Sequence, residues 1–452
     1  MVQPHELSVA RSAEAIRQGR ISPVELAQSL LGRIDDLDQD LQAWVTIDRE
    51  DVLSAAKDRE EDLKSGRPTG LIHGVPVGLK DIFYTEGMKT TACSRIYADF
   101  VPEYDATCVT KIKAAGGIVL GKAVTTEFAT SDPSPTRNPW NPAHTPGGSS
   151  SGSAVAVATQ MCSAALGSQT GGSTCRPAAY NGIVGLKATY GRISRYGVVP
   201  VSWSLDTVGI LVRTVDDAAT MLQVMSGHDF NDPGSSAQPV PDFLEEMKSS
   251  DRPPRIGLLS GFFRDHSTND VWQHTQEVAQ KLAQAGAVVE DVQLPPSFAS
   301  CHSCQRIVMN VECASFHQEF FRERADEYGA RIRSSIETGM LVPGVDYLKA
   351  QRLRRVFRQE MTDMLTGYDV VLTPATPAPA PKDLNTTGDA AFQSPWTSSG
   401  LPSIVIPSGL SDDGLPLGIQ IAARPWQEGI MLGAASWAQK ALGVNITPPQ
   451  TR

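Results

Sequence analysis

The chain has 452 residues, of which 41% are hydrophobic and 20% charged, so it is long and apolar enough to bury a sizeable core. This composition excludes a disordered chain, a collagen and a coiled coil. The 40 Lys and Arg residues against 50 Asp and Glu residues give a formal charge of -10, which argues against nucleic acid as a direct ligand.

The sequence has no segment typical of export or of a membrane span. Its N-terminus lacks an apolar run behind a basic start, and no stretch reaches about 18 uninterrupted apolar residues. We therefore expect a cytoplasmic protein with no membrane partner. The seven cysteines are an odd number spread along the chain. This favours buried or reactive free thiols over a disulfide framework.

The first half of the chain alternates helical and extended patterns. Ser22, Pro23 and Glu25 form a helix start with a capping box, and apolar residues at helical spacing continue to Leu37. The later elements predicted in this half are a helix over 105–117, a strand over 118–124, an extended segment over 202–211 and a helix over 215–227.

The second half begins after 228–254, a segment rich in Asp, Pro, Gly and Ser that predicts a surface loop. The elements predicted after it are a strand over 255–263, a helix over 270–285, a strand over 287–294, a mostly helical region over 305–366, and strands over 369–377 and 403–409. This alternation of helices and strands predicts one large α/β domain.

Three segments are rich in glycine, serine and lysine without a packing reason: 74–81, 145–158 and 166–194. In the first, Lys80 ends an apolar, strand-like run. Burial there would lower the pKa of the amine, and a neutral lysine can act as a base near pH 7. The alternative is a lysine that reaches solvent at the end of a strand.

Two Gly-Gly-Ser sequences lie in the other two segments. Ser173 follows paired glycines, where successive backbone N–H groups can converge on one point, as an oxyanion hole requires. Ser149 also follows paired glycines, 24 residues upstream, before an Ala/Val run that predicts a buried helix. Either could be a flexible turn, but with the lysine they predict a nucleophilic Ser-Ser-Lys site.

These segments resemble the amidase signature family. The resemblance continues through 177–194, 202–209 and 400–425, so it covers most of the chain. It implies a single α/β domain over 1–452, with a mixed central β-sheet covered by helices on both faces. Its parts are expected to be a signature core over about 70–227, a variable loop over about 228–254 and a C-terminal part over 255–452.

The resemblance also implies a Ser-cisSer-Lys triad. Ser173 is then the acyl-forming nucleophile, Ser149 the serine after a cis peptide bond, and Lys80 the base that takes a proton through Ser149. The backbone N–H groups expected to hold the substrate oxygen are those of Thr170, Gly171, Gly172 and Ser173. Such a site implies no cofactor and no metal.

The chain departs from the common family pattern at a few positions. Ser151-Gly152 stands where paired glycines are usual, and 168–170 reads Ser-Gln-Thr instead of Thr-Asp-Thr. Arg176 lies three residues after the nucleophile, not two. This is similar to bacterial malonamidases, in which the arginine binds a substrate carboxylate. We expect Arg176 either to bind substrate or to be a structural clamp.

Other short motifs are weaker. Ser150 fits a G-x-S-x-G pattern, but the segment before it cannot be the strand that a nucleophile elbow requires. Ser54 and Lys57 match S-x-x-K on a charged helical stretch. A zinc site could be drawn from Cys301, Cys304, Cys313 and His317. The helical pattern around the last two favours buried thiols on an ordinary amphipathic helix instead.

The leading hypothesis is a free-standing amide hydrolase that cleaves the C–N bond of a small-molecule carboxamide. The alternative is the glutaminase A subunit of a tRNA-dependent amidotransferase, which uses the same triad to release ammonia from glutamine. Thr207, where that subunit has Gln, and the position of Arg176 argue against it. A non-catalytic binding or scaffold protein would need a damaged triad, and none is visible. Which amide is cleaved and whether the chain forms a homodimer are left open.

Overall fold

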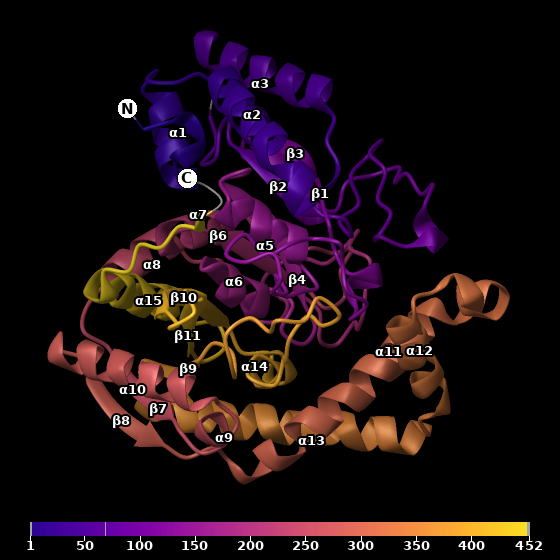
Figure 1. Cartoon of the computed structure of the whole chain (residues 1–452), viewed down its shortest axis with the longest axis vertical. Helices are drawn as coiled ribbons and strands as arrows, with labels where there is room; N and C mark the ends of the chain where they lie inside the picture. The colour runs from indigo at the N-terminus through magenta and orange to yellow at the C-terminus, as the bar shows by residue number, and fades with distance from the viewer. Residues whose placement is uncertain (1, 68, 450–452) are drawn as a thin grey trace.

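The computed structural model describes residues 2–67 and 69–449, and its centre is one β-sheet of eleven strands (Figure 1). The strands are β1 (Trp44–Thr46), β2 (Pro76–Lys80), β3 (Ile118–Ala123), β4 (Ala164–Gln169), β5 (Val184–Lys187), β6 (Thr207–Val212), β7 (Arg255–Leu259), β8 (Val288–Val292), β9 (Val370–Pro374), β10 (Ser403–Leu410) and β11 (Pro416–Ala422).

The sheet is mixed, and both halves of the chain contribute to it. Its strand order is β1-β3-β2-β4-β6-β5-β10-β11-β9-β7-β8. Strands β3, β2 and β4 run parallel, as do β9, β7 and β8, while the pairs from β4 to β9 through the centre are antiparallel. This confirms the expected α/β fold with a mixed central sheet.

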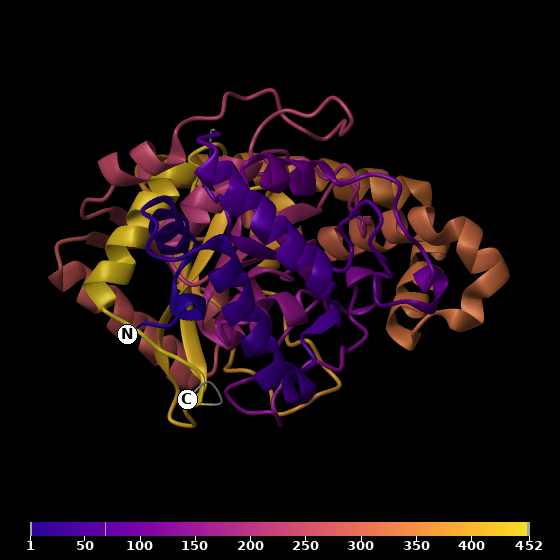
Figure 2. The ribbon, with the colours of Figure 1, turned by 90° about the horizontal axis from the view of Figure 1, so that it is seen from above.

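Helices cover both faces of the sheet (Figures 1 and 2). They are α1 (Val9–Arg17), α2 (Pro23–Leu41), α3 (Arg49–Lys64), α4 (Thr107–Ala114), α5 (Ser151–Ala158), α6 (Cys175–Asn181), α7 (Val215–Met225), α8 (Phe243–Ser249), α9 (Phe262–Asp265), α10 (Asn269–Gln284), α11 (Cys301–Arg324), α12 (Ala330–Leu341), α13 (Gly344–Met364), α14 (Ser394–Ser399) and α15 (Glu428–Leu442). In both views α11, α12 and α13 lie at one side of the molecule.

The sheet has a hydrophobic core on each face. Alternate residues of a strand pack in different cores, because successive side chains point to opposite faces. In β4, Leu166 packs in the core with α4, α7, α10 and α15, whereas Ala165 packs in the core with α2, α3 and α5. In the C-terminal half, Val371 of β9 faces a third core that contains Phe357 of α13 and Trp396 of α14. The central strands β2, β4, β5 and β6 are therefore buried along their whole length.

Most predicted elements are confirmed, with shifted ends. The capping box at Ser22 and Glu25 is present, and its helix runs on to Leu41. The predicted loop over 228–254 is wrong in part, because it contains α8, whose Phe243 and Met247 are buried. The extended segment over 202–211 becomes a strand only at Thr207. The strands β1, β4, β5 and β11 were not predicted.

Two further observations concern the chain as a whole. All seven cysteines are free thiols, and six of them are buried. Within residues 2–67 and 69–449, none of the helices is both long and apolar enough to cross a membrane.

Candidate active site

Lys80, Ser149 and Ser173 come from three neighbouring elements. Strand β2 ends at Lys80 and pairs in parallel with β4, so that Leu79 lies opposite Leu166. The carboxyl ends of parallel strands meet at the same edge of a sheet, which brings the lysine next to the turn that follows β4. That turn carries Ser173. The carbonyl oxygen of Ser173 accepts a hydrogen bond, at 3.3 Å, from the N–H of Ser150, the residue that follows Ser149, so the two segments are joined.

The lysine amine is buried between two serine hydroxyls. Nζ of Lys80 lies 2.7 Å from Oγ of Ser149 and 2.8 Å from Oγ of Ser168, and the side chain is 0% exposed. Burial lowers the pKa of Lys80 to about 7, although the nearby Asp206 carboxyl and Cys93 thiol act in the opposite direction. A large fraction of the amine is therefore neutral at physiological pH and can accept a proton.

The low pKa of Lys80 predicts how activity depends on pH. A lysine base acts only when neutral, so kcat/KM for an uncharged amide should rise with unit slope up to about pH 7 and then level off. The measurement is a rate profile from about pH 5 to pH 9. A profile that is flat over this range, or that still rises at its alkaline end, would contradict the role of Lys80 as the base.

Ser149 follows a cis peptide bond from Gly148, as the family resemblance implies. Arg176, 5% exposed, holds the carbonyl of that bond, because Nη2 donates to O of Gly148 at 2.7 Å. The same guanidinium donates to O of Gly388 at 2.8 Å and to Oγ1 of Thr387 at 3.1 Å. Both of its terminal nitrogens are thus engaged by the protein, whereas Nε has no partner among the described residues.

The turn before Ser173 presents free backbone N–H groups. In the described chain, no protein group accepts a hydrogen bond from the N–H of Gly171, Gly172 or Ser173. The next two N–H groups, of Thr174 and Cys175, instead donate to Oε1 of Gln169 at 3.1 and 3.0 Å. The turn can therefore direct its unpaired N–H groups at a substrate oxygen, as in an oxyanion hole.

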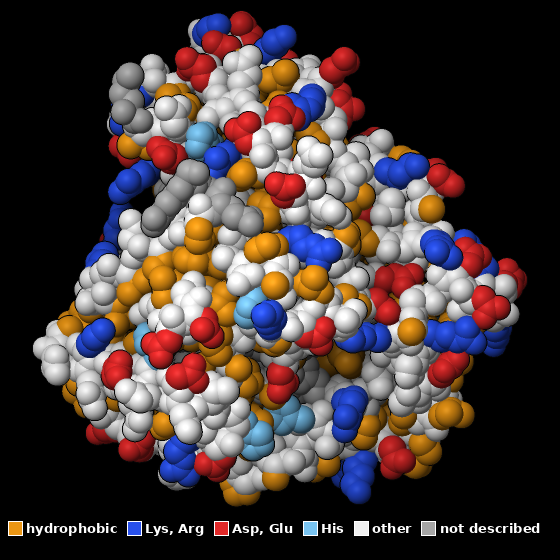
Figure 3. Space-filling view, viewed as in Figure 1, with side chains coloured by type: hydrophobic (Ala, Val, Ile, Leu, Met, Phe, Trp, Pro, Cys, Tyr) orange, Lys and Arg blue, Asp and Glu red, His pale blue; other side chains and the backbone are white. Residues whose placement is uncertain are grey.

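A cavity of about 630 Å³ opens in front of this turn. Thr170, Gly171, Gly172, Ser173 and Arg176 line it on one side. Helix α11 and the segment 386–394 line the other, and Ser173 is 8% exposed. Figure 3 shows this face hollowed between α14 and the helices α11 and α13, with blue and pale-blue side chains beside the hollow. The nucleophile candidate is thus both shielded and reachable.

Sequence reasoning missed three residues that support this geometry. Ser168 is the second partner of Lys80, and Gln169 fixes the turn, although both positions were noted only as departures from the family pattern. Asp206 accepts from Oγ1 of Thr170 at 2.5 Å and from the N–H groups of two further residues, and burial raises its pKa. A half-buried carboxyl next to the oxyanion turn could have been suspected from its place in an apolar segment.

Ser168 offers a test of how the lysine is held. Replacing it with alanine removes one acceptor from a buried ammonium, so we expect the pKa of Lys80 to fall further and kcat to drop about tenfold. Rate profiles against pH for Ser168→Ala should show the lower midpoint. The control is Ser153→Ala, whose buried hydroxyl donates to O of Leu166. Equal effects of both variants would contradict the role of Ser168.

The weaker motifs lie elsewhere or serve the framework. Oγ of Ser150 is bonded to the backbone of Ser168, while Ser54 and Lys57 lie exposed on α3. The possible zinc ligands all lie on α11: Cys301, Cys304, Cys313 and His317. Among the residues that the structure describes, no three His, Cys, Asp or Glu side chains are grouped so that they could hold a metal ion.

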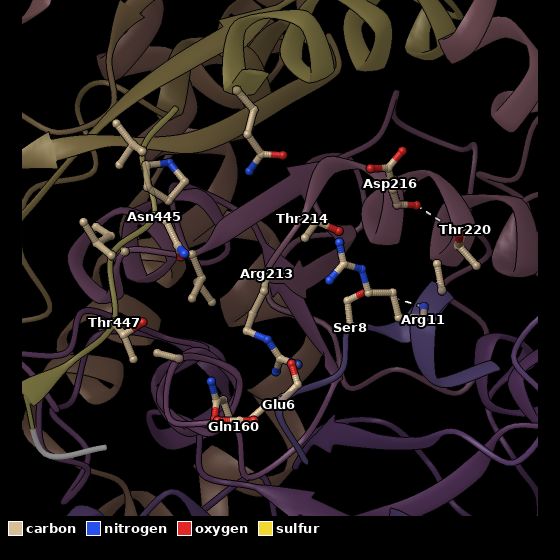
Figure 4. A pocket seen from close by; sticks show the side chains of 18 of the residues that line it. Glu6, Ser8, Arg11, Gln160, Arg213, Thr214, Asp216, Thr220, Asn445 and Thr447 are labelled. Carbon is tan, nitrogen blue, oxygen red and sulfur yellow. Dashed lines mark hydrogen bonds between the residues drawn. The ribbon is translucent and has the colours of Figure 1, made fainter. Parts of the chain in front are cut away.

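A second cavity, of about 760 Å³, lies apart from these residues (Figure 4). The N-terminal segment, α7 and the segment 444–448 border it, and Arg213 extends between them. The guanidinium of Arg213 is engaged by backbone carbonyls, including O of Cys162 at 3.1 Å. This cavity contains none of the three triad candidates.

Known proteins resemble this chain over nearly its whole length. The family model Amidase matches residues 25–432. The A subunit of glutamyl-tRNA(Gln) amidotransferase from Carboxydothermus hydrogenoformans is 37% identical, covering 95% of this chain and 96% of the relative. The structure of peptide amidase from Stenotrophomonas maltophilia gives a TM-score of 0.87 at 29% identity and 98% coverage of both chains. A chain from a vestigial protein complex that reveals the origins of an s-triazine catabolic enzyme gives 0.91 at 29% identity, covering 97% of this chain and 99% of that one.

Proposed function

This chain belongs to the amidase signature family of amide-hydrolysing enzymes, and from that premise we propose that it cleaves carboxamides through an acyl-enzyme on Ser173. The observation that carries the proposal is the buried amine of Lys80 at 2.7 Å from Oγ of Ser149, beside a turn with unpaired N–H groups. The products are a carboxylate and ammonia or an amine.

Acylation uses the serines as a proton relay. Neutral Lys80 accepts the proton of Ser149, which takes the proton of Ser173 as Oγ of Ser173 attacks the amide carbon. The N–H groups of residues 170–173 bind the oxygen that becomes negative. When the C–N bond breaks, the proton returns from Lys80 through Ser149 to the leaving nitrogen.

Deacylation repeats the relay with water. Water gives its proton through Ser149 to Lys80 and attacks the ester carbon of the acyl-enzyme on Ser173. The same N–H groups donate hydrogen bonds to the oxyanion of this second tetrahedral intermediate. Collapse returns the proton from Lys80 through Ser149 to Ser173 and releases the carboxylic acid, which then loses its proton to solvent to give the carboxylate. The enzyme therefore needs no co-reactant other than water.

Arg176 supports this site as a clamp. Its contacts with the carbonyls of Gly148 and Gly388 tie the cis peptide segment to the segment that lines the far side of the cavity. If Arg176 turned toward a substrate, these two carbonyls would lose their hydrogen-bond donor, which would destabilise the site. We therefore assign Arg176 the structural role and not the binding of a substrate carboxylate.

A second candidate function is favoured by sequence similarity. The 37% identity with the amidotransferase A subunit extends over 95% of this chain, and other relatives with the same name are 34–35% identical. The chain would then release ammonia from glutamine as one subunit of a larger assembly, with protein partners. Thr207 and the position of Arg176 still differ from the pattern expected of that subunit.

The test is a panel of amides assayed with the purified chain. Butanamide, an anilide, succinamate and L-glutamine would be compared through release of ammonia or aniline, against Ser173→Ala. Turnover of several amides by the chain alone supports a free-standing hydrolase. Turnover confined to glutamine, together with a second chain that co-purifies, supports the amidotransferase role. If no amide is turned over faster than by Ser173→Ala, the proposed function is wrong.

A further inference from the structure

One face of helix α11 forms a wall of the active-site cavity. Its lining residues recur three or four positions apart, the spacing of neighbours on one helix face. They are His302, Gln305, Arg306, Met309, Asn310 and Cys313. Gln305 fastens this face to the oxyanion turn, because Nε2 donates to O of Thr170 at 2.7 Å. Residues next to Gln305 on this face therefore lie close to the reacting centre.

The cavity gathers positive charge in a chain whose formal charge is -10. The Arg, Lys, Asp and Glu residues that line it are Arg176, Arg306, Arg331 and Asp389. Three are arginines and one is an aspartate. A positively charged pocket raises the local concentration of anions and disfavours cations. The charge of the cavity therefore favours anionic substrates over cationic ones.

Arg306 differs from the other two arginines in having an unengaged guanidinium. Arg176 is held by carbonyls of the framework, and Arg331 donates to O of Ser131 at 3.1 Å and to O of Asn385. Arg306 is exposed and lines the cavity, and its guanidinium forms no hydrogen bond or ion pair with any residue that the structure describes. Its five N–H donors are free for a ligand.

Asn310 provides a second free polar group one turn further along α11. It lines the same cavity and is 8% exposed, yet its side-chain amide has no partner in the described part of the chain. Because Asn310 lines the cavity, its amide can be hydrogen-bonded there by water or by a ligand. Residues 306 and 310 are four apart, so both side chains project from the same face of the helix.

We propose that Arg306 and Asn310 bind a carboxylate of the substrate, and that the enzyme acts on amides that carry a carboxylate away from the scissile bond. The guanidinium matches a carboxylate in shape and charge, and Asn310 can donate to the same group. This inference rests on the proposed amide hydrolysis at Ser173. It also replaces Arg176, which the framework engages, as the anchor of an anionic substrate.

The test compares amides that differ only in the carboxylate. Succinamate is paired with butanamide, and glutaramate with pentanamide, while L-glutamine adds an ammonium group to the carboxylated amide. In Arg306→Gln, kcat/KM for the carboxylated amides should fall about 10- to 100-fold, mostly through KM, because a charged hydrogen-bonded pair is lost. The uncharged amides should change less than about twofold. Arg306→Lys should restore part of the loss.

A matched control lies on the same helix. Arg322 is exposed, forms no part of the cavity lining and has no hydrogen-bond or ion-pair partner among the described residues, so Arg322→Gln removes one charge at a distance. Its ratio of rates for succinamate and butanamide should equal that of the unchanged enzyme. If Arg306→Gln also leaves this ratio unchanged, the carboxylate site is wrong while the amide hydrolysis stands.

A binding measurement gives an answer that does not depend on turnover. Succinate should protect Ser173 from a serine-directed fluorophosphonate more strongly than the uncharged butanamide does, and Arg306→Gln should abolish the difference. Equal protection by both compounds in the unchanged enzyme would overturn the inference. Labelling that is equally strong in Ser173→Ala would instead overturn the proposed function itself, so the two failures are distinguishable.

Discussion

Replacing Ser173 with alanine should reduce kcat for amide hydrolysis by about 10⁴-fold or more, because it removes the atom that forms the acyl-enzyme. The oxyanion N–H groups and the cavity remain, so residual turnover and substrate binding should persist at a low level. The measurements are ammonia release under single-turnover conditions and the mass of the protein after incubation with a fluorophosphonate. The unchanged enzyme should gain one phosphonyl adduct and the variant none.

A suitable control for this variant is Ser131→Ala. Ser131 lines the same cavity but lies outside the relay, and its carbonyl, not its hydroxyl, holds Arg331. Its activity should stay within about threefold of the unchanged enzyme. A phosphonyl adduct that persists in Ser173→Ala, or a kcat reduced equally in both variants, would contradict the assignment of Ser173 as the nucleophile.

Replacing Lys80 with methionine should reduce kcat by roughly 10³-fold, within the range for loss of a general base. Methionine has a similar length and suits the apolar surroundings, so the protein should still fold. It cannot accept the proton of Ser149, which loses its partner at 2.7 Å. We expect the inflection near pH 7 to disappear from the remaining activity, as a rate profile would show.

A second buried lysine serves as the control for Lys80. Burial also lowers the pKa of Lys187 to about 7, but its amine donates to O of Ala188 and contacts no residue of the triad. Lys187→Met should therefore keep kcat within about tenfold and retain the inflection near pH 7. If both variants lost activity equally, the effect would reflect the removal of a buried lysine and not the loss of a base. A lowered pKa alone thus does not identify a catalytic base, because Lys187 has one too. What distinguishes Lys80 is its contact with the hydroxyls of Ser149 and Ser168.

The local features of the site could be read from the sequence, because they depend on short segments. Lys80 at the end of an apolar run, and two serines after paired glycines, indicate their chemistry without knowledge of the fold. Their convergence could not be derived from these segments, since it depends on β2 lying beside β4. Strand β4 itself was not predicted, because its Ala, Gly and Ser residues have weak strand preferences.

The site residues that lie far from the triad segments in the sequence could not be predicted, for a different reason. Arg306 belongs to a long helix whose pattern predicts only that it is helical, and nothing local tells which face borders the cavity. Gln305 and Asp206 likewise matter through partners 135 and 36 positions away. Arg176 was noticed for its position, but its contacts with Gly388 and Thr387 belong to tertiary structure.

The two halves of the chain supply different parts of the active site, and this has an evolutionary consequence. The lysine, both serines and the oxyanion turn all precede residue 180, whereas α11 and 386–394, which face them across the cavity, come from the second half. Mutations in α11 can therefore alter which amides are accepted while the bond-breaking residues are inherited unchanged. Substitutions in α11 could therefore give an enzyme new substrates while every ancestor along the way keeps an intact set of catalytic residues.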